Sequence, residues 1–129
     1  MIEHRSVLNL LQALNREVYG KHQGTNLRIS LNGPLAFDTS VKQFIQLLNG
    51  HTLYVVTEEV RQDPSALIEF CKQNSLDVLD CTPTMLGLLL SEGLLEAAAG
   101  SPAVVLVGGE PIDQHTWELL AQSEKIAFY

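Results

Sequence analysis

The fold of this chain is decided by the stretch Ala103-Val104-Val105-Leu106-Val107, which the turn Gly108-Gly109-Glu110-Pro111 ends. An uninterrupted apolar run of this length, rich in β-branched residues, is typical of a strand that is buried on both faces. Such strands occur in parallel sheets, because the crossover connections between parallel strands place helices over both faces of the sheet. The stretch therefore predicts an α/β fold with this strand inside the sheet.

Outward from this strand, strand and helix patterns alternate along the chain. Apolar alternation and β-branched residues predict further strands at Leu27–Leu31, Thr52–Val56, Leu76–Cys81 and Ile126–Tyr129. Apolar periodicity and capping residues predict helices over Ser6–Tyr19, Ser40–Asn49, Asp63–Asn74, Thr82–Leu90, Leu94–Ala99 and about Gln114–Ser123, with a loop over Lys21–Asn26.

This alternation, with connections of only a few residues, predicts right-handed crossovers and a single α/β domain over residues 1–129. We expect a flavodoxin-like or Rossmann-like three-layer sandwich, with about five parallel strands in the order 2-1-3-4-5 and helices on both faces. Trp117, in the last predicted helix, is expected to pack in the core.

Composition and charge exclude several classes of protein. A net charge of -7 would repel both the phosphate backbone of nucleic acids and anionic lipid heads. Cys71 and Cys81 form no C-x-x-C pair, so we expect buried, reduced thiols. The chain shows neither the basic and apolar regions of a signal peptide nor an apolar run that could span a bilayer. We therefore expect a soluble, cytoplasmic protein that binds neither nucleic acid nor membranes.

In open parallel sheets, ligands bind beyond the carboxyl ends of the strands. Three places lie at or after the ends of predicted strands: the junction at Asp38, the Asp80-Cys81-Thr82 corner and the Gly108-Gly109-Glu110 turn. We expect these places to lie along one edge of the sheet.

The segment from Phe37 to Phe44 carries a possible helix start. With Ser40 as the N-cap, Gln43 would complete a capping box. Asp38 would then lie just before the helix, and Lys42 would lie in the first turn, where a cation opposes the helix dipole. A residue in a locally unfavourable place suggests another role.

Each of these residues also has a purely structural interpretation. Asp38 can be a helix-entry acid or can bind a ligand cation such as an α-ammonium. Lys42 can be a solvated surface lysine or can pair with a ligand carboxylate, and Asp80 can accept hydrogen bonds from the next helix or neutralise Lys42. Gly108-Gly109 can be a turn or can admit a ligand close to the backbone.

Other chemistries lack their sequence patterns. The four histidines form no i,i+4 pair, so we expect no metal site. The chain has no G-x-x-x-x-G-K-[ST] loop, no G-x-G-x-x-G turn and no G-x-S-x-G elbow. We therefore expect no catalytic residues in this chain alone.

Several short motifs occur in order along the chain. They are Ile2-Glu3-His4-Arg5-Ser6-Val7 followed by Leu8-Asn9, Phe37-Asp38-Thr39-Ser40, Thr82-Pro83-Thr84, and Val107-Gly108-Gly109-Glu110-Pro111. Together they resemble the middle of an amino-acid adenylation domain of a nonribosomal peptide synthetase. These domains are a branch of the AMP-forming acyl-CoA synthetase and luciferase superfamily, and the resemblance covers essentially the whole chain.

The resemblance implies a fold, a reaction and a set of site residues. The fold would be one of the flavodoxin-like subdomains of the N-terminal core. In the reaction, an amino-acid carboxylate attacks the α-phosphate of Mg-ATP, and the aminoacyl group then passes to a carrier-protein thiol. Asp38 would bind the α-ammonium, Thr39, Lys42, Asp80, Leu106 and Gly108 would line the side-chain pocket, and Gly109, Glu110 and Pro111 would lie against the adenine.

The family's glycine-rich phosphate loop would lie upstream of Met1, and its Y-G-P-T-E motif would follow Tyr129. We therefore expect an internal fragment that forms no adenylate alone and binds no cofactor tightly. Its apolar helix faces would be exposed, which favours self-association.

An ammonium inside a pocket is costly unless a carboxylate meets it, so Lys42 predicts an acidic amino acid, glutamate before aspartate. If Asp80 instead occupies Lys42, the neutral polar pocket suits glutamine. The alternative from another class is a self-standing flavodoxin-like binding or signalling module, for which Asp38 and Asp80 are the candidate acids.

Overall fold

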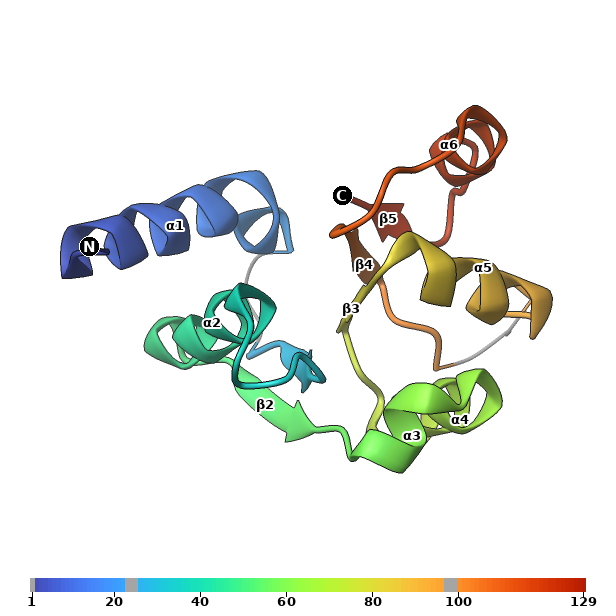
Figure 1. Ribbon diagram of the computed structural model, residues 1–129, viewed down its shortest axis with the longest axis horizontal. Coiled ribbons are helices and arrows are strands. Elements are labelled where there is room, and N and C mark those ends of the chain that lie inside the picture. The colour runs from blue at the N-terminus through green and yellow to red at the C-terminus, as the bar shows by residue number, and fades with distance from the viewer. Residues whose placement is uncertain (1, 23–25, 97–99) are drawn as a thin grey trace.

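The computed structural model describes residues 2–22, 26–96 and 100–129. Its centre is a sheet of five parallel strands in the order β2-β1-β3-β4-β5 (Figure 1). The predicted strand order and parallel direction are thereby confirmed. The strands are β1 Arg28–Leu31, β2 Thr52–Val55, β3 Val78–Cys81, β4 Val104–Val107 and β5 Ala127–Phe128.

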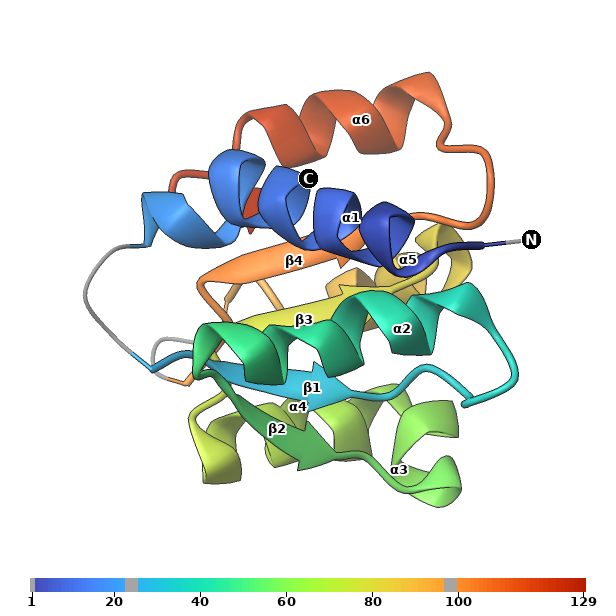
Figure 2. The same cartoon turned by 90° about the vertical axis from the view of Figure 1, so that its left-hand side faces the viewer.

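Helices cover both faces of the sheet and complete a three-layer sandwich. The first face carries α1 and α2, and the second carries α3, α4, α5 and α6 (Figures 1 and 2). The bounds are α1 His4–Glu17, η1 Tyr19–Lys21, α2 Asp38–Phe44, η2 Ile45–Asn49, α3 Glu58–Gln62, α4 Pro64–Asn74, α5 Pro83–Ser91 and α6 Gln114–Ala121, where η marks a 3-10 helix.

The strand β4 is buried on both faces, as its uninterrupted apolar sequence predicts. Val105 is fully buried in a core cluster with Leu79 of β3 and with side chains of α4, α5 and α6. Val104 and Leu106 point to the opposite face and pack with Val18 and other residues of a second cluster. The alternation along one strand thus joins the sheet to both helix layers.

The junction between β1 and β3 is the weakest part of the sheet. β1 pairs with β2, and β3 with β4, over the full length of each strand, whereas β1 and β3 share only the pair Ile29 and Val78. The strand order also reverses here, since β2 lies on one side of β1 and the later strands lie on the other. Such a switch point is where sheets of this class bind ligands.

Several helix starts and ends follow the predicted capping residues. Asp63 caps α4 by accepting a hydrogen bond from the Ala66 amide at 3.1 Å, and Thr82 caps α5 through the Met85 amide at 3.3 Å. Gly50 ends η2 with a left-handed backbone, φ 80°, which glycine adopts without strain.

The predicted capping box at Ser40 is wrong. The helix α2 begins two residues earlier, at Asp38, and the side chain of its N-cap, Phe37, makes no capping hydrogen bond. The Ser40 hydroxyl instead donates to the Phe37 carbonyl at 2.7 Å, and Gln43 turns toward the sheet. Lys42 therefore lies in the last turn of α2, where the negative end of the helix dipole stabilises a cation.

Further differences concern short or terminal segments. The helix α3 was not predicted, because five residues with one apolar side chain show no period. Leu94 to Glu96 form turns rather than a helix, since Gly93 with φ 85° ends the helical run, and Ala97 to Ala99 lie outside the described residues. Trp117 is 58% exposed, because α6 packs through Leu120 instead. None of the helices in the described ranges is long and apolar enough to cross a membrane.

Candidate functional site

A cleft of about 900 Å³ lies at the carboxyl ends of the central strands. Segments that are distant in sequence meet there: the loop after β1, the start of α2, the end of β3 and the glycine turn after β4. Its lining comprises Leu10, Asn32, Gly33, Pro34, Phe37, Asp38, Thr39, Lys42, Arg61, Gln62, Leu67, Asp80, Cys81, Thr82, Met85, Gly108 and Gly109.

Asp38 and Thr39 reach the cleft because α2 begins close to the end of β1. Asp38 is exposed, and its carboxylate makes no hydrogen bond or ion pair within the described parts of the chain. A Cβ at Gly33 would lie 2.9 Å from the Ser40 nitrogen and 3.0 Å from the Thr39 methyl carbon. Glycine at this position therefore permits the close approach of α2, a requirement that the sequence pattern alone does not reveal.

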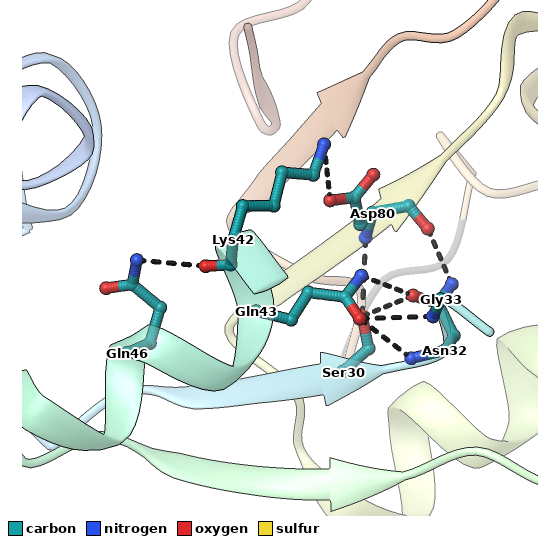
Figure 3. Close-up of polar contacts among 7 residues, drawn as sticks. All are labelled: Ser30, Asn32, Gly33, Lys42, Gln43, Gln46 and Asp80. Carbon is teal, nitrogen blue, oxygen red and sulfur yellow. Dashed lines mark hydrogen bonds and ion pairs between the residues drawn. The ribbon is translucent and has the colours of Figure 1, made fainter. Parts of the chain in front are cut away.

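Lys42 and Asp80 form an ion pair in the lining of the cleft. The Lys42 Nζ and Asp80 Oδ2 atoms are 2.7 Å apart, and the side chains are 25% and 6% exposed, respectively (Figure 3). Burial raises the pKa of Asp80, and the positive charge of Lys42 and hydrogen bonds from Lys42 and Gln43 oppose this rise.

Arg61 and Gln62 also line the cleft, although the sequence pattern pointed to neither. Both belong to α3, whose short sequence gives no helical period. Arg61 forms an ion pair with Glu58 of the same helix, and its side chain is 30% exposed. The lining of the cleft therefore contains Arg61 as a second positively charged side chain in addition to Lys42.

The glycine turn after β4 only partly belongs to the cleft. Gly108 and Gly109 line it, and at Gly109, with φ 90°, no atom lies within 4 Å of the place that a Cβ would take. This open turn would allow a flat ring to approach the backbone.

Glu110 and Pro111 do not line the cleft. Glu110 accepts hydrogen bonds from the Thr84 amide at 2.9 Å and the Thr84 hydroxyl at 2.6 Å, and these lower the pKa of Glu110. It thereby ties the loop after β4 to the first turn of α5.

Leu106 also lies outside the cleft lining, because its side chain is buried with Val18 and Tyr19 under α1 and η1. The structure thus brings together Asp38, Thr39, Lys42, Asp80, Gly108 and Gly109, and leaves Leu106, Glu110 and Pro111 beside the cleft. In the described ranges, no group of three or more His, Cys, Asp or Glu side chains is arranged to hold a metal ion.

The family model for the AMP-binding enzymes matches residues 1–126. Because this match covers nearly the whole chain, the chain belongs to the AMP-binding enzyme family. The resemblance found in the sequence motifs is thereby confirmed.

Within this family, the chain corresponds to part of an adenylation domain of the nonribosomal peptide synthetase type. The AMB antimetabolite synthetase AmbE of Pseudomonas aeruginosa is 48% identical over 121 residues, which cover 94% of this chain and 6% of that protein. Bacitracin synthase 1 of Bacillus licheniformis is 46% identical over 90 residues, which cover 69% of this chain and 2% of that protein. The chain therefore spans only a small share of the length of these relatives.

Solved structures show the same fold. The nonribosomal peptide synthetase FmoA3, in its AMPPNP-bound form, superposes with a TM-score of 0.78 at 22% identity, covering 98% of this chain and 14% of that chain. The O-succinylbenzoate coenzyme A synthetase of Bacillus subtilis, in complex with ATP and a magnesium ion, gives a TM-score of 0.70 at 17% identity, covering 90% of this chain and 23% of that chain.

Proposed function

We propose that residues 1–129 form one subdomain of the N-terminal core of an amino-acid-activating, adenylate-forming ligase and supply a wall of its amino-acid pocket. The observation that carries the proposal is the presence of two charged features, Asp38 and the Lys42–Asp80 pair, in the lining of one cleft. Asp38 presents a carboxylate without a partner in the described chain, and the Lys42–Asp80 pair lies elsewhere in the same lining. The α-ammonium of an amino acid would match the Asp38 carboxylate, and a polar side chain could bond to the Lys42–Asp80 pair.

In this proposal Asp38 binds the α-ammonium, since an opposite charge stabilises it directly. Thr39 and Gly108 shape the side-chain pocket and Gly109 lies against the adenine, while Leu106, Glu110 and Pro111, which were expected in these roles, lie beside the cleft. The open turn at Gly109 supports its assignment to the adenine. ATP and magnesium would serve the complete domain, and a carrier-protein domain would receive the aminoacyl group.

Asp80 does occupy Lys42, which is the arrangement stated above to suit glutamine, but we still place glutamate first and glutamine second. An ammonium has three N–H donors, so Lys42 can hold Asp80 and still donate to a ligand carboxylate. Because the pKa of Asp80 is raised, its carboxylate takes a proton more easily when the carboxylate of a glutamate ligand approaches. Two adjacent negative charges are then avoided. Glutamine would need no such protonation, since its amide can donate to Asp80 and accept from Lys42.

Calorimetric titration of the chain with glutamate, glutamine and aspartate tests the proposal. Asp38→Asn should weaken the binding of all three, by about tenfold or more, because the charge-assisted hydrogen bond to the α-ammonium is lost. Lys42→Gln should weaken glutamate by about tenfold and leave glutamine within about threefold. Lys72→Gln, an exposed lysine on α4, is the matched control and should change neither.

Two results would contradict the assignments. If Asp38→Asn binds glutamate as tightly as the wild type, Asp38 does not hold the ammonium. If Lys42→Gln leaves glutamate affinity unchanged, the acidic side chain is not recognised by Lys42.

The chain alone should not form an adenylate, because its sequence has none of the glycine-rich loops that cradle a triphosphate. Amino-acid-dependent pyrophosphate exchange by the 129-residue chain should therefore stay at the level of the blank. Exchange above the blank would show that the chain carries its own phosphate machinery.

A further inference from the structure

Gln43 is a polar side chain in an unexpected place. It follows Lys42 on α2 and is only 1% exposed. Both ends of its amide are used: Oε1 accepts from the backbone nitrogens of Asn32 at 3.2 Å and Gly33 at 3.1 Å, and Nε2 donates to Asn32 Oδ1 at 2.8 Å (Figure 3). The side chain therefore fixes α2 to the loop that leaves β1.

Asn32 carries the connection on to β3. Its Nδ2 atom donates to the backbone carbonyl of Asp80 at 2.6 Å. Beside it, the Asp80 amide donates to the Ser30 hydroxyl at 3.3 Å. A continuous series of hydrogen bonds thus runs from Gln43, one residue after Lys42, to the backbone that carries the Asp80 carboxylate (Figure 3).

This series lies where the sheet lacks a backbone ladder. β1 and β3 pair only at Ile29 and Val78, so beyond this point side chains join the two strands. We call Ser30, Asn32 and Asp80 the seam. Lys42 lies on α2, which Gln43 joins to the loop after β1, and Asp80 lies on β3. The seam and Gln43 therefore set the position of the Lys42 ammonium relative to the Asp80 carboxylate.

We propose that Gln43, acting through Asn32, is a positioning residue that determines which amino-acid side chain the cleft accepts. The inference rests on the proposed function, because it concerns the ligand that Lys42 and Asp80 would meet. Gln43 itself touches no substrate. It holds Lys42 and Asp80 at a fixed spacing, and only an amino-acid side chain of a certain length and charge fits that spacing.

A glutamine suits this position for a chemical reason. The position needs an acceptor for two backbone N–H groups and a donor for Asn32 Oδ1, and it is buried. Glutamate would lack the donor, and methionine, of similar shape, would lack both. A buried backbone amide left without a partner costs about 1–3 kcal/mol, which favours a shift of the loop.

Gln46 provides a matched control on the same helical segment. It is equally buried, at 0% exposure, and donates to the Lys42 carbonyl at 3.1 Å and accepts from Asn49 at 3.2 Å. None of these bonds reaches β1 or β3. A purely structural role for buried glutamines predicts similar effects of Gln43→Met and Gln46→Met.

The first test compares the ratio of glutamate to glutamine affinity in the wild type, Gln43→Met and Gln46→Met by calorimetry. Gln43→Met should change the ratio by about tenfold, and Gln46→Met should leave it within about twofold. An unchanged ratio in Gln43→Met, or equal changes in both variants, would overturn the inference.

The second test needs no ligand, so it separates this inference from the proposed function. Carboxyl NMR follows the titration of Asp80, whose titratable or charged neighbours are Lys42, Tyr19 and Cys81. Gln43 lowers the pKa of Asp80, so Gln43→Met should raise it, whereas Gln46→Met should not. Absence of amino-acid binding in the wild type would reject the proposed function, and an unmoved Asp80 titration in Gln43→Met would reject this inference.

If Gln43→Met fails to fold, the wild-type chain supplies the measurement. The side-chain amide resonances of Gln43 should shift as Asp80 titrates, while those of Gln46 should stay in place. A Gln43 amide that does not respond would overturn the positioning role.

Discussion

Asp80 is held between two opposing influences at the scale of a single residue. Its removal from water disfavours the charged carboxylate, and the nearby ammonium of Lys42 favours it. Burial is the larger influence, so the pKa of Asp80 lies above its value in an unfolded chain. A ligand that approaches Lys42 therefore meets a carboxylate that takes a proton more readily than a surface aspartate does.

The stability of the chain should depend on pH through this residue. A carboxyl group with a raised pKa binds more protons in the folded state than in the unfolded state, so its contribution to stability falls as the pH rises through that interval. Asp80→Asn should gain thermal stability relative to the wild type as the pH rises from about 4 toward the folded pKa of Asp80. Melting temperatures of both proteins across the acidic range measure this difference.

Glu69→Gln, an exposed change of the same charge on α4, is the control and should show no such trend. A constant difference between Asp80→Asn and the wild type at every pH would contradict the raised pKa.

The thiols of Cys71 and Cys81 are expected to be unreactive in the folded chain. Burial raises the pKa of each to about 12, and each is at most 7% exposed. The reactive thiolate is therefore scarce at pH 8. Iodoacetamide should label neither cysteine until the chain unfolds, which mass spectrometry in increasing urea can follow. Rapid labelling without denaturant would show that the core cluster around Val105, to which both cysteines belong, opens locally.

At the scale of helices and strands, the predictable features were those with local causes. The apolar run of β4, the caps at Asp63 and Thr82 and the stop at Gly50 each depend on a few adjacent residues. The role of Gln43 depends on Asn32, which lies on another element, so a pattern read along the chain assigned it to a capping box.

The candidate site divides in the same way. Asp38, Asp80 and the glycine turn could be placed at one edge from the parallel sheet alone. Arg61 could not, because α3 has too few apolar residues to show a period. The pairing of Lys42 with Asp80 could be named only as one alternative, since sequence does not give a distance.

Two glycines, one inside a helix and one that ends a helix, should respond in opposite directions to alanine. Gly87 lies inside α5 at an exposed position, with open space around it, so Gly87→Ala should stabilise the chain by about 0.5–1 kcal/mol. Gly50 has φ 80°, so Gly50→Ala should destabilise it by about 1 kcal/mol despite equal space. Urea unfolding of both variants measures the two changes, and shifts of the same sign would contradict the conformational argument.

At the scale of the whole molecule, the outer surface of α2 and η2 is strongly apolar. Phe44, Leu47 and Leu48 are 44%, 51% and 69% exposed, and Phe37 and Val41 extend the same surface. We call these five residues the α2 patch. Contiguous apolar surface of this kind is typical of an interface rather than of a free monomer.

The isolated chain should therefore associate with itself through the α2 patch. Replacing Phe44 and Leu48 with lysine should shift the association equilibrium toward the monomer by about tenfold or more, because a charge cannot be buried without a partner. Sedimentation velocity over a range of concentrations measures the shift. Leu119→Lys, on α6 and 39% exposed, is the control and should leave association unchanged. A wild type that stays monomeric at every concentration would contradict the prediction.

The single register pair between β1 and β3 has a mechanical consequence. The sheet has two halves, which share only the register pair Ile29 and Val78. One half consists of β2 and β1 with α2, and the other consists of β3, β4 and β5. Asp38 and Lys42 belong to the half with α2, and Asp80 and the glycine turn belong to the other half. Few backbone hydrogen bonds hold the two halves together, so the side-chain hydrogen bonds of the seam, rather than a strand ladder, set the width of this cleft.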